Sequence, residues 1–337
     1  MNFKKLTISP ASYYDLLIKP NFADLIPGGQ YTGTLSEFTV MDDVSSKRKI
    51  IDILGARNIL KRRDASCNIT FSPVGKASIR TIETDPIYGA TQQCDNEFYQ
   101  GCLEDFRNSN PKFTDFILDF FLKAIKVDIN SNMYFGDITR PNDATGNWNW
   151  NTFDGIFKHY FDFINKGIIP ANQTTAFNSG AITPQDGYDF LHWAWGRQDI
   201  FLRHLPNEMK AFYVSQSIFD AYEEFLILTG GANNIQYYIN GIPKLKFKGI
   251  DVLVETTWDP ILNILNGGND AHACILTIRG NFVFATDKTY GERTDTGVEA
   301  LSVWYDRNSY SWKYVNFLRA GTGIAYPEHS VIGLTNF

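Results

Sequence analysis

The sequence has few cysteines, little charge and no long apolar run. Its 337 residues include four cysteines, which form neither a CxxC pair nor a zinc-ligand spacing. We therefore expect reduced, structural cysteines and no metal site. No stretch approaches the roughly 18 apolar residues of a membrane span, and the N-terminus is too short in apolar length for a signal peptide. These absences favour a protein made and kept in a cytoplasm, with no membrane partner.

Common catalytic and nucleotide-binding motifs are also missing. The sequence contains no GxSxG elbow, no HExxH pair and no Gly-rich phosphate loop. The Gly321-Thr-Gly323 pair comes late and is not followed by a predicted helix. The five histidines make no close pair, so each fits a core or surface position better than a ligand position. We expect no catalytic residue, no cofactor and no enzyme activity.

Aromatic side chains are abundant, because Phe, Trp and Tyr make up 15% of the chain. Charged residues make up only 20%, which excludes intrinsic disorder for most of the chain. The net charge is −6, yet residues 1–63 contain ten Lys and Arg against six Asp and Glu. The runs Lys47-Arg48-Lys49 and Lys61-Arg62-Arg63 fit either contact with a polyanion or a solvated face.

The first 95 residues predict two extensions rather than a globular unit. Prolines and glycines split the short apolar clusters of residues 1–63, which predicts an arm without a core of its own, with one helix near Ser46–Leu60. The runs Asn68–Phe71 and Ala77–Ile82, joined by Ser72–Gly75, predict a β-hairpin. Because an isolated hairpin is marginal in water, it must lie on its own domain or on a neighbouring subunit.

A long helix is predicted next. Asn110 can cap it, Pro111 suits its first position, and apolar residues at helical spacing run from Phe113 to about Met133 and stop at Gly136. Further helices are predicted over Asp154–Lys166, Thr183–Arg197 and Ser215–Thr229, with a strand over Met209–Val214.

Strands dominate after residue 235. The pattern predicts Lys246–Lys248 and Ile250–Val254, then two hairpins: Ala273–Ile278 with Asn281–Ala285, and Ser302–Tyr305 with Trp312–Leu318. Helices therefore gather in the middle and strands toward the end, which predicts the α+β class.

Four tryptophans raise the possibility of a glycan site. Trp148 and Trp150 share one face if the backbone is extended, whereas Trp193 and Trp195 diverge on a predicted helix. Asp154, Asp162, Asp186 and Asp189 could in principle supply the acid and base of a glycosidase. Core packing beneath a loop is the favoured explanation for the tryptophans.

Five segments, taken in order, resemble a known family. They are Lys126–Asp137, Ala211–Tyr222, Asn240–Val252, Asn281–Asp287 and Trp312–Pro327. In order and spacing they resemble the spine-helix end, axial-domain strands and helix, and closing strand of tailed-phage major capsid proteins. These proteins have the Hong Kong 97-like fold, and the chain looks most like those of Bacteroidetes-type phages. The likeness covers residues 64–337.

The resemblance implies a division of the chain. It implies an N-terminal arm (1–63), an extended hairpin loop (64–95), a peripheral domain with the spine helix (96–137 and 298–327), an axial domain (138–297) and a C-terminal tail (328–337). Lys76 falls where one family member carries a cross-linking lysine, although most members do not cross-link.

The resemblance also implies a function. A major capsid protein self-assembles as pentamers and hexamers into an icosahedral shell around double-stranded DNA, which it contacts non-specifically. Portal and scaffolding or decoration proteins would be partners, and the protein would reside in the virion after assembly in the bacterial cytoplasm. An encapsulin-like compartment shell and a glycan-binding or glycan-cleaving protein are the alternatives.

The sequence is physically consistent with assembly. A hairpin and an arm that cannot stand alone would gain stability by lying on a neighbouring copy, and head-to-tail contacts that close make rings. The surplus of aromatic residues would then be buried partly between copies.

Overall fold

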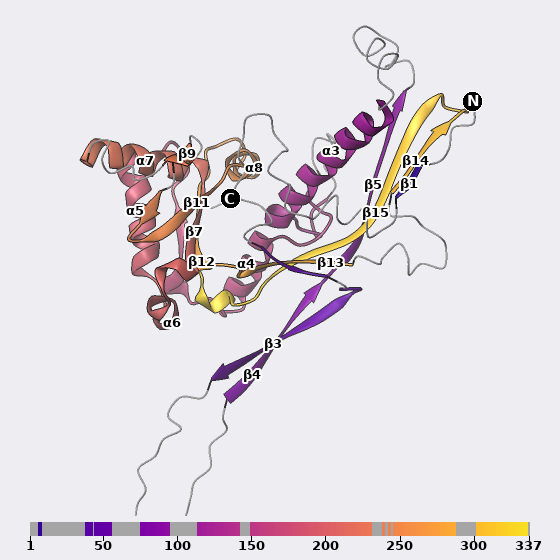
Figure 1. Cartoon of the computed structure of the whole chain (residues 1–337). Coiled ribbons are helices and arrows are strands. Elements are labelled where there is room, and N and C mark those ends of the chain that lie inside the picture. The colour runs from indigo at the N-terminus through magenta and orange to yellow at the C-terminus, as the bar shows by residue number, and fades with distance from the viewer. Residues whose placement is uncertain are drawn as a thin grey trace, which may run out of the picture.

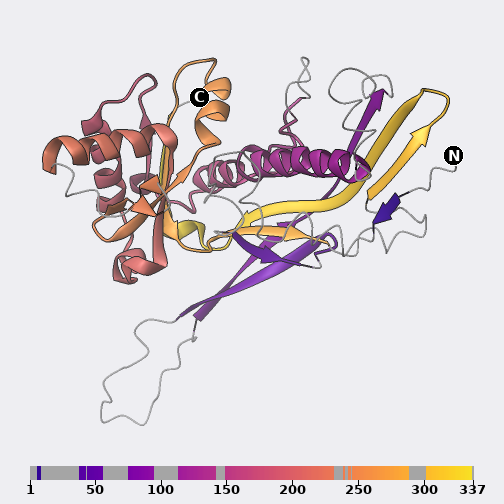
Figure 2. The same ribbon diagram turned by 45° about the horizontal axis from the view of Figure 1, so that its top comes forward.

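The computed structural model describes residues 6–8, 38–42, 44–55, 75–94, 113–141, 149–230, 238–239, 242–243, 245–287 and 301–335. They form two six-stranded sheets, a long helix beside the first sheet and a group of helices around the second (Figure 1). A two-stranded hairpin projects away from both sheets (Figures 1 and 2). This mixture of segregated helices and strands agrees with the predicted class.

The first sheet is organised around one long strand, β15 (Ser311–Ile324). It pairs antiparallel with β5 (Asp85–Cys94), with β14 (Leu301–Asp306) and, near its end, with β13 (Phe282–Thr286). Two short strands complete the sheet: β1 (Leu6–Ile8) beside β14 and β2 (Phe38–Met41) beside β13. The predicted hairpin of β14 and β15 is confirmed.

The second sheet has the order β10-β11-β7-β12-β16-β6. Its strands are β10 (Lys246–Phe247), β11 (Ile250–Glu255), β7 (Lys210–Ser215), β12 (Ala273–Ile278), β16 (Val331–Thr335) and β6 (Thr174–Phe177). All six residues of the central strand β7 are buried. A separate pair is formed by β8 (Tyr238–Ile239) and β9 (Ile242–Pro243).

The predicted helices form close to their expected positions. They are α3 (Phe113–Phe135), α4 (Ile156–Asn165), α5 (Pro184–Gly196) and α7 (Gln216–Gly230). The structure adds two helices that were not predicted, the short α6 (Ile200–His204) and α8 (Trp258–Leu265). Short 3₁₀ turns lie at Ala171–Gln173, Asn207–Met209 and Pro327–His329. α5 begins where predicted, because Thr183 and Asp186 form a reciprocal capping box.

Residues of β7 alternate between two hydrophobic cores. Phe212 and Val214 pack with α5 and α7, whereas Ala211 and Tyr213 face the larger core, which extends to α3, α4 and α8. This alternation is the period-two pattern of a strand that is covered on both faces.

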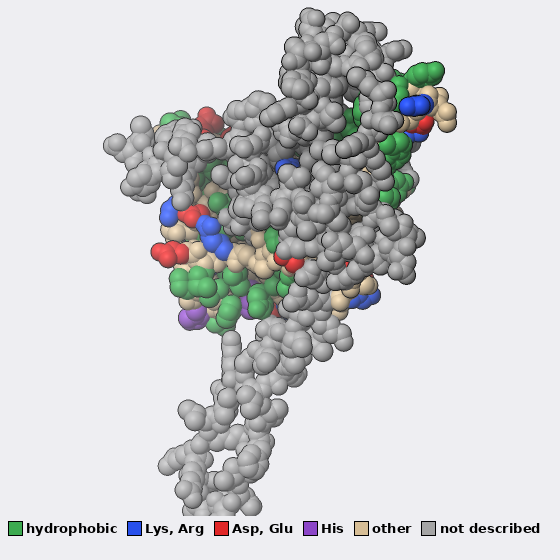
Figure 3. Space-filling view, turned by 45° about the vertical axis from the view of Figure 1, so that its right-hand side comes forward, with side chains coloured by type: hydrophobic (Ala, Val, Ile, Leu, Met, Phe, Trp, Pro, Cys, Tyr) green, Lys and Arg blue, Asp and Glu red, His purple; other side chains and the backbone are tan. Residues whose placement is uncertain are grey.

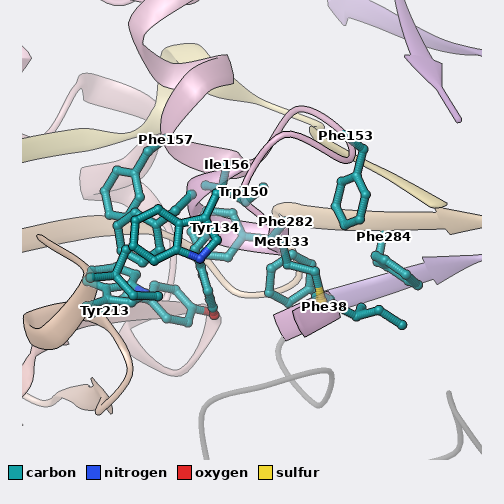
Figure 4. Packing of buried hydrophobic residues seen from close by; sticks show 14 of the residues in the cluster. Phe38, Met133, Tyr134, Trp150, Phe153, Ile156, Phe157, Tyr213, Phe282 and Phe284 are labelled. Carbon is teal, nitrogen blue, oxygen red and sulfur yellow. The ribbon is translucent and has the colours of Figure 1, made fainter. Parts of the chain in front are cut away.

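An aromatic cluster joins the two sheets. Tyr134, near the end of α3, lies with its ring 5.3 Å from that of Trp258 on α8 and 5.5 Å from that of Phe38 on β2 (Figure 4). The ring of Phe282 on β13 lies 4.8 Å from that of Tyr213 on β7. Much of the aromatic surplus is therefore buried within one chain, rather than between copies.

Two predictions about the extensions are wrong. Residues 47–55 form strand β3 (Lys47–Gly55) instead of a helix, because they pair antiparallel with β4 (Gly75–Glu83) over nine registered residues. The hairpin partner of β4 is therefore β3, and not the run Asn68–Phe71, which lies outside the described residues.

One further prediction fails at long range. β12 and β13 follow one another but belong to different sheets, so the turn at Arg279-Gly280 is a crossover and not a hairpin. The expected C-terminal tail contains β16, which is buried between β12 and β6. The expected arm contributes β1 and β2 to the chain's own first sheet.

Candidate functional site

The most unusual surface of the molecule is the projecting hairpin of β3 and β4. Each strand has nine residues, which at about 3.3 Å per residue spans roughly 30 Å. The two strands form a sheet of their own, paired only with each other among the described strands. A hairpin of this length has two edges and two faces that another chain can contact.

The base of the hairpin is fastened to the first sheet by polar contacts. Arg80 pairs with Glu328, with 2.6 Å between Nη2 and Oε2, and also donates to the carbonyl of Ala325. Arg319 on β15 donates to the carbonyl of Thr84 at 2.8 Å, and Thr84 in turn bonds Val44 and Ser46. The hairpin is therefore fixed at its root and extended at its far end.

Apolar packing supports the same root. Ile82 is buried with Val44, Val283 and Ala285 in a small core of its own. A Cβ added at Gly321 would lie 2.0 Å from the carbonyl oxygen of Glu83, so β4 passes very close to β15 there. The requirement for glycine at this position explains part of the late Gly-Thr-Gly pattern that the sequence left without a role.

A hollow of about 830 Å³ lies between α3 and the strands β5 and β15. Its described lining is mostly apolar and includes Phe121, Ile125 and Leu318. Asn316 also lines it, is 1% exposed, and has no hydrogen-bond partner for its Oδ1 among the described residues. Such a hollow suits an apolar group that carries one hydrogen-bond donor.

Ser217, His272 and Asp259 form a polar group that the sequence did not reveal. The Oγ of Ser217 lies 2.7 Å from His272 Nδ1 and 3.2 Å from Asp259 Oδ1, while His272 Nε2 bonds the carbonyl of Gly180 at 2.8 Å. A nucleophilic triad needs the order Ser–His–Asp, but here the carboxylate contacts the serine and the backbone amide of Ser217. Burial raises the pKa of Asp259. The group ties α7, α8 and β12 together.

The tryptophans do not form an aromatic platform for a glycan among the described residues. Trp150 is 7% exposed and packs in the large core, and Trp148 lies outside the described residues. On α5, Trp193 packs against Phe177, whereas Trp195 is 37% exposed and lies beneath the ammonium of Lys248. The divergence of Trp193 and Trp195 is confirmed.

The four aspartates considered for acid–base chemistry lie in two places, two of them at or near α4 and two on α5. Asp154 accepts from the amide of Ile138 at the root of α4, which also contains Asp162. On α5, Asp186 belongs to the capping box and Asp189 accepts from the side chain of Gln185. The structure gives three of them local hydrogen bonds.

The basic runs and histidines are dispersed. Lys47 on β3 pairs with Glu83 at 2.6 Å, whereas Lys61-Arg62-Arg63 lies outside the described residues and no side chain is described for Lys76. His272 is buried, His159 is half-buried, and His329 contacts Asp199 at 2.9 Å. Among the described residues no cluster suited to a metal ion occurs. Nor does any described helix have the length and apolarity needed to cross a membrane.

Comparisons with known proteins identify the fold. Neither family models nor curated sequences match the chain. Solved structures do match it. A chain of the capsid of Myoviridae phage XM1 has a TM-score of 0.55 and 9% identity, covering 92% of this chain and 95% of that chain. A chain of the satellite phage P4 procapsid, which includes the size determination (Sid) protein, has a TM-score of 0.54 and 9% identity, covering 90% and 94%.

A third match is the cyanophage A-1(L) capsid, with a TM-score of 0.51 and 11% identity, covering 93% of this chain and 99% of that chain. The chain has the fold of phage capsid proteins. The capsid fold accounts for the long α3 beside one sheet, the helix-covered second sheet and the projecting hairpin. It is the Hong Kong 97-like fold that the sequence resemblance implied.

Proposed function

We propose that this chain is a major capsid protein that self-assembles into a closed icosahedral shell. The observation that carries the proposal is the match over nine-tenths of both chains to capsid structures from three different phages.

The hairpin supports the same proposal physically. A two-stranded ribbon is marginal in water, yet β3 and β4 extend well beyond their anchored root (Figure 2). Contact with a neighbouring copy would cover the ribbon and add many modest interactions to each subunit interface. Arg80 and Arg319 hold only the root of the hairpin, so that the rest of the hairpin projects outward and is free to contact a neighbouring copy.

The finer features of the proposal follow the family resemblance. The shell would consist of pentamers and hexamers, enclose double-stranded phage DNA through non-specific contacts, and use portal and scaffolding or decoration proteins. The peripheral domain (96–137 and 298–327) would contain α3, β14 and β15, and the axial domain (138–297) would contain the helices α4 to α8. The protein would belong to a Bacteroidetes-type phage, assemble in the host cytoplasm, reside in the virion and have no enzyme activity.

Expression followed by negative-stain microscopy and gradient sedimentation tests the proposal. We expect shells, rings or tubes when the chain is made alone or beside a neighbouring scaffold gene. A product that stays monomeric at every concentration and with every scaffold tried would refute it.

The contents of the particles separate a phage shell from a compartment shell, which the fold alone does not distinguish. A phage shell purified from infected or induced cells would protect DNA from nuclease. A compartment shell would instead copurify with a stoichiometric enzyme. For the glycan alternative, retention on a glycan array should be lost in a Trp148→Ala/Trp150→Ala variant. The buried position of Trp150 does not favour that alternative.

A further inference from the structure

Two surfaces on opposite edges of the second lobe carry opposite charge. This lobe comprises the second sheet with α5, α6, α7 and α8. α5 lies between the other two helices, so that α7 and α6 occupy different edges (Figures 1 and 2). The hairpin projects on the side of α6 (Figure 1). If the chain assembles as proposed above, each edge faces a neighbouring copy.

The first surface, named here the basic edge, surrounds α6. It contains Trp195, Arg197, Ile200, Phe201, Arg203 and Lys248, all exposed. Ile200 is 65% exposed and Phe201 44%. Figure 3 shows hydrophobic side chains, with histidines among them, at the lower edge of this lobe.

Local contacts hold the basic edge in place. The Nζ of Lys248 lies 3.5 Å from the ring centroid of Trp195, and Arg203 Nη2 donates to the carbonyl of Gly196 at 2.8 Å. The rings of Phe201 and His329 stack 4.3 Å apart. Side chains that are already positioned lose less conformational freedom on binding.

The second surface, named here the acidic face, is the outer side of α7. Asp220, Glu224, Ile227 and Leu228 stand at positions i, i+4, i+7 and i+8, which lie on one side of a helix. Ile227 is 46% exposed and Leu228 69%. A hollow of about 340 Å³ beside the helix is lined by Asp220, Glu224, Asp259 and Asp270, among others, so the negative charge extends beyond α7.

Each surface therefore combines exposed apolar side chains with an excess of one charge. On the basic edge Arg197, Arg203 and Lys248 outnumber the exposed Glu208 and the half-buried Asp199, which pairs with His329. Clustered exposed apolar groups mark contact sites, and complementary charges select the partner and the register. A two-fold contact would place each surface against its own copy and oppose like charges. A head-to-tail contact instead brings unlike charges together at every interface, and it forms a ring where the rotation between copies closes.

We propose that the acidic face of one copy docks on the basic edge of the next copy around each ring. The contact rests on the proposed function, which it deepens by assigning the surfaces. Arg197 and Arg203 would meet Asp220 and Glu224, while Ile200 and Phe201 would pack against Ile227 and Leu228.

Charge reversal tests this contact. One variant carries Arg197→Glu and Arg203→Glu, another carries Asp220→Lys and Glu224→Lys, and a third carries all four changes. We expect each double variant to reduce the assembled fraction at least tenfold at a concentration where the parent assembles fully. The four-fold variant should regain most of it, because every interface again joins unlike charges.

Mixing the two double variants gives a sharper expectation. Each alone opposes like charges, but alternating copies oppose unlike charges at every contact. Mixtures should therefore form rings with an even number of copies, and no rings with an odd number, since an odd ring must place two identical copies side by side. Class averages of negatively stained rings distinguish these outcomes.

A matched reversal provides the control. Lys166→Glu alters an exposed cation just beyond α4, outside both surfaces, and should leave assembly unchanged. Thermal melting of every variant verifies folding. If folded double variants assemble as well as the parent, or the folded four-fold variant does not recover, this contact is wrong while the proposed function stands. A parent that remains monomeric at every concentration overturns both.

Discussion

At the scale of single residues, the start of α5 shows how one side chain determines an element. Thr183 Oγ1 accepts from the amide of Asp186 at 3.3 Å, while an Asp186 carboxylate oxygen accepts from the amide and hydroxyl of Thr183 at 2.8 and 2.6 Å. These hydrogen bonds satisfy donors that the first turn of a helix leaves without partners. The boundary of α5 was therefore predictable from four residues.

Thr183→Ala should lower the free energy of unfolding by about 1 kcal/mol at neutral pH. The hydrogen bond from the Thr183 side chain lowers the pKa of Asp186 below its ordinary value of 3.8. A lowered folded-state pKa adds stability above the unfolded value, and that stability is lost as the pH falls through the folded value. The difference between Thr183→Ala and the parent should therefore shrink in acid. Urea unfolding at several pH values measures it.

Thr229→Ala is the matched control. Its hydroxyl donates to the carbonyl of Phe225 inside α7 and is exposed, so the same chemical change removes no cap. It should change stability little and equally at all pH values. A loss for Thr183→Ala that is no larger, or that does not depend on pH, contradicts the role given to the capping box.

At the scale of elements, the sequence predicts those that local signals determine, and it does not predict those that depend on pairing with distant strands. The helix over 113–135 is determined by nearby residues, namely the helical spacing of its apolar side chains and the glycine at 136 that ends it. It forms as predicted. Residues 47–55 have apolar side chains whose spacing also fits a helix, and only their pairing with β4 makes them a strand. The turn at Gly280, where φ is +72°, fits a hairpin, but the strands on either side join different sheets.

The candidate surfaces follow the same division. The acidic face of α7 is readable as i, i+4, i+7 and i+8 once the helix is known. The residues of the basic edge come from α5, α6 and the turn at Lys248, so no periodic pattern in the sequence predicts this surface. The polar group of Ser217, Asp259 and His272 joins residues 42 and 55 positions apart and leaves no mark in the sequence.

Gly321→Ala should weaken the close packing of β4, at the root of the hairpin, against β15. The added Cβ would lie 2.0 Å from the backbone oxygen of Glu83, and a backbone atom cannot rotate away. We expect a loss of about 1–3 kcal/mol in the free energy of unfolding, measured by urea denaturation of unassembled subunits.

Gly196→Ala, at the end of α5, meets nothing within 4 Å and is the matched comparison. Alanine is the better helix former, so this change should be neutral or stabilise by up to about 1 kcal/mol. Equal losses for the two variants would show that β4 does not approach β15 as closely as described.

At the scale of the whole molecule, a single core joins the first sheet and α3 to the second lobe, so that these parts form one body. The large cluster includes residues of α3, β13 and β7, so it spans both sheets. Tyr134 reaches from α3 to Glu255 on β11, with 2.9 Å between the hydroxyl and the carboxylate.

The thiol of Cys274 reports on the integrity of the second core, which β7 and β12 form with α5 and α7. It lies on β12 at the centre of the second sheet, where burial raises its pKa, whereas Cys94 at the end of β5 is exposed. In a Cys67→Ser/Cys102→Ser background, one thiol should react with an aromatic disulfide reagent at once, and the second only as fast as the subunit unfolds. Adding Cys94→Ser should remove the fast phase alone. Immediate reaction of both thiols in the folded subunit would mean that the second sheet and the helices α5 and α7 do not form the closed core described.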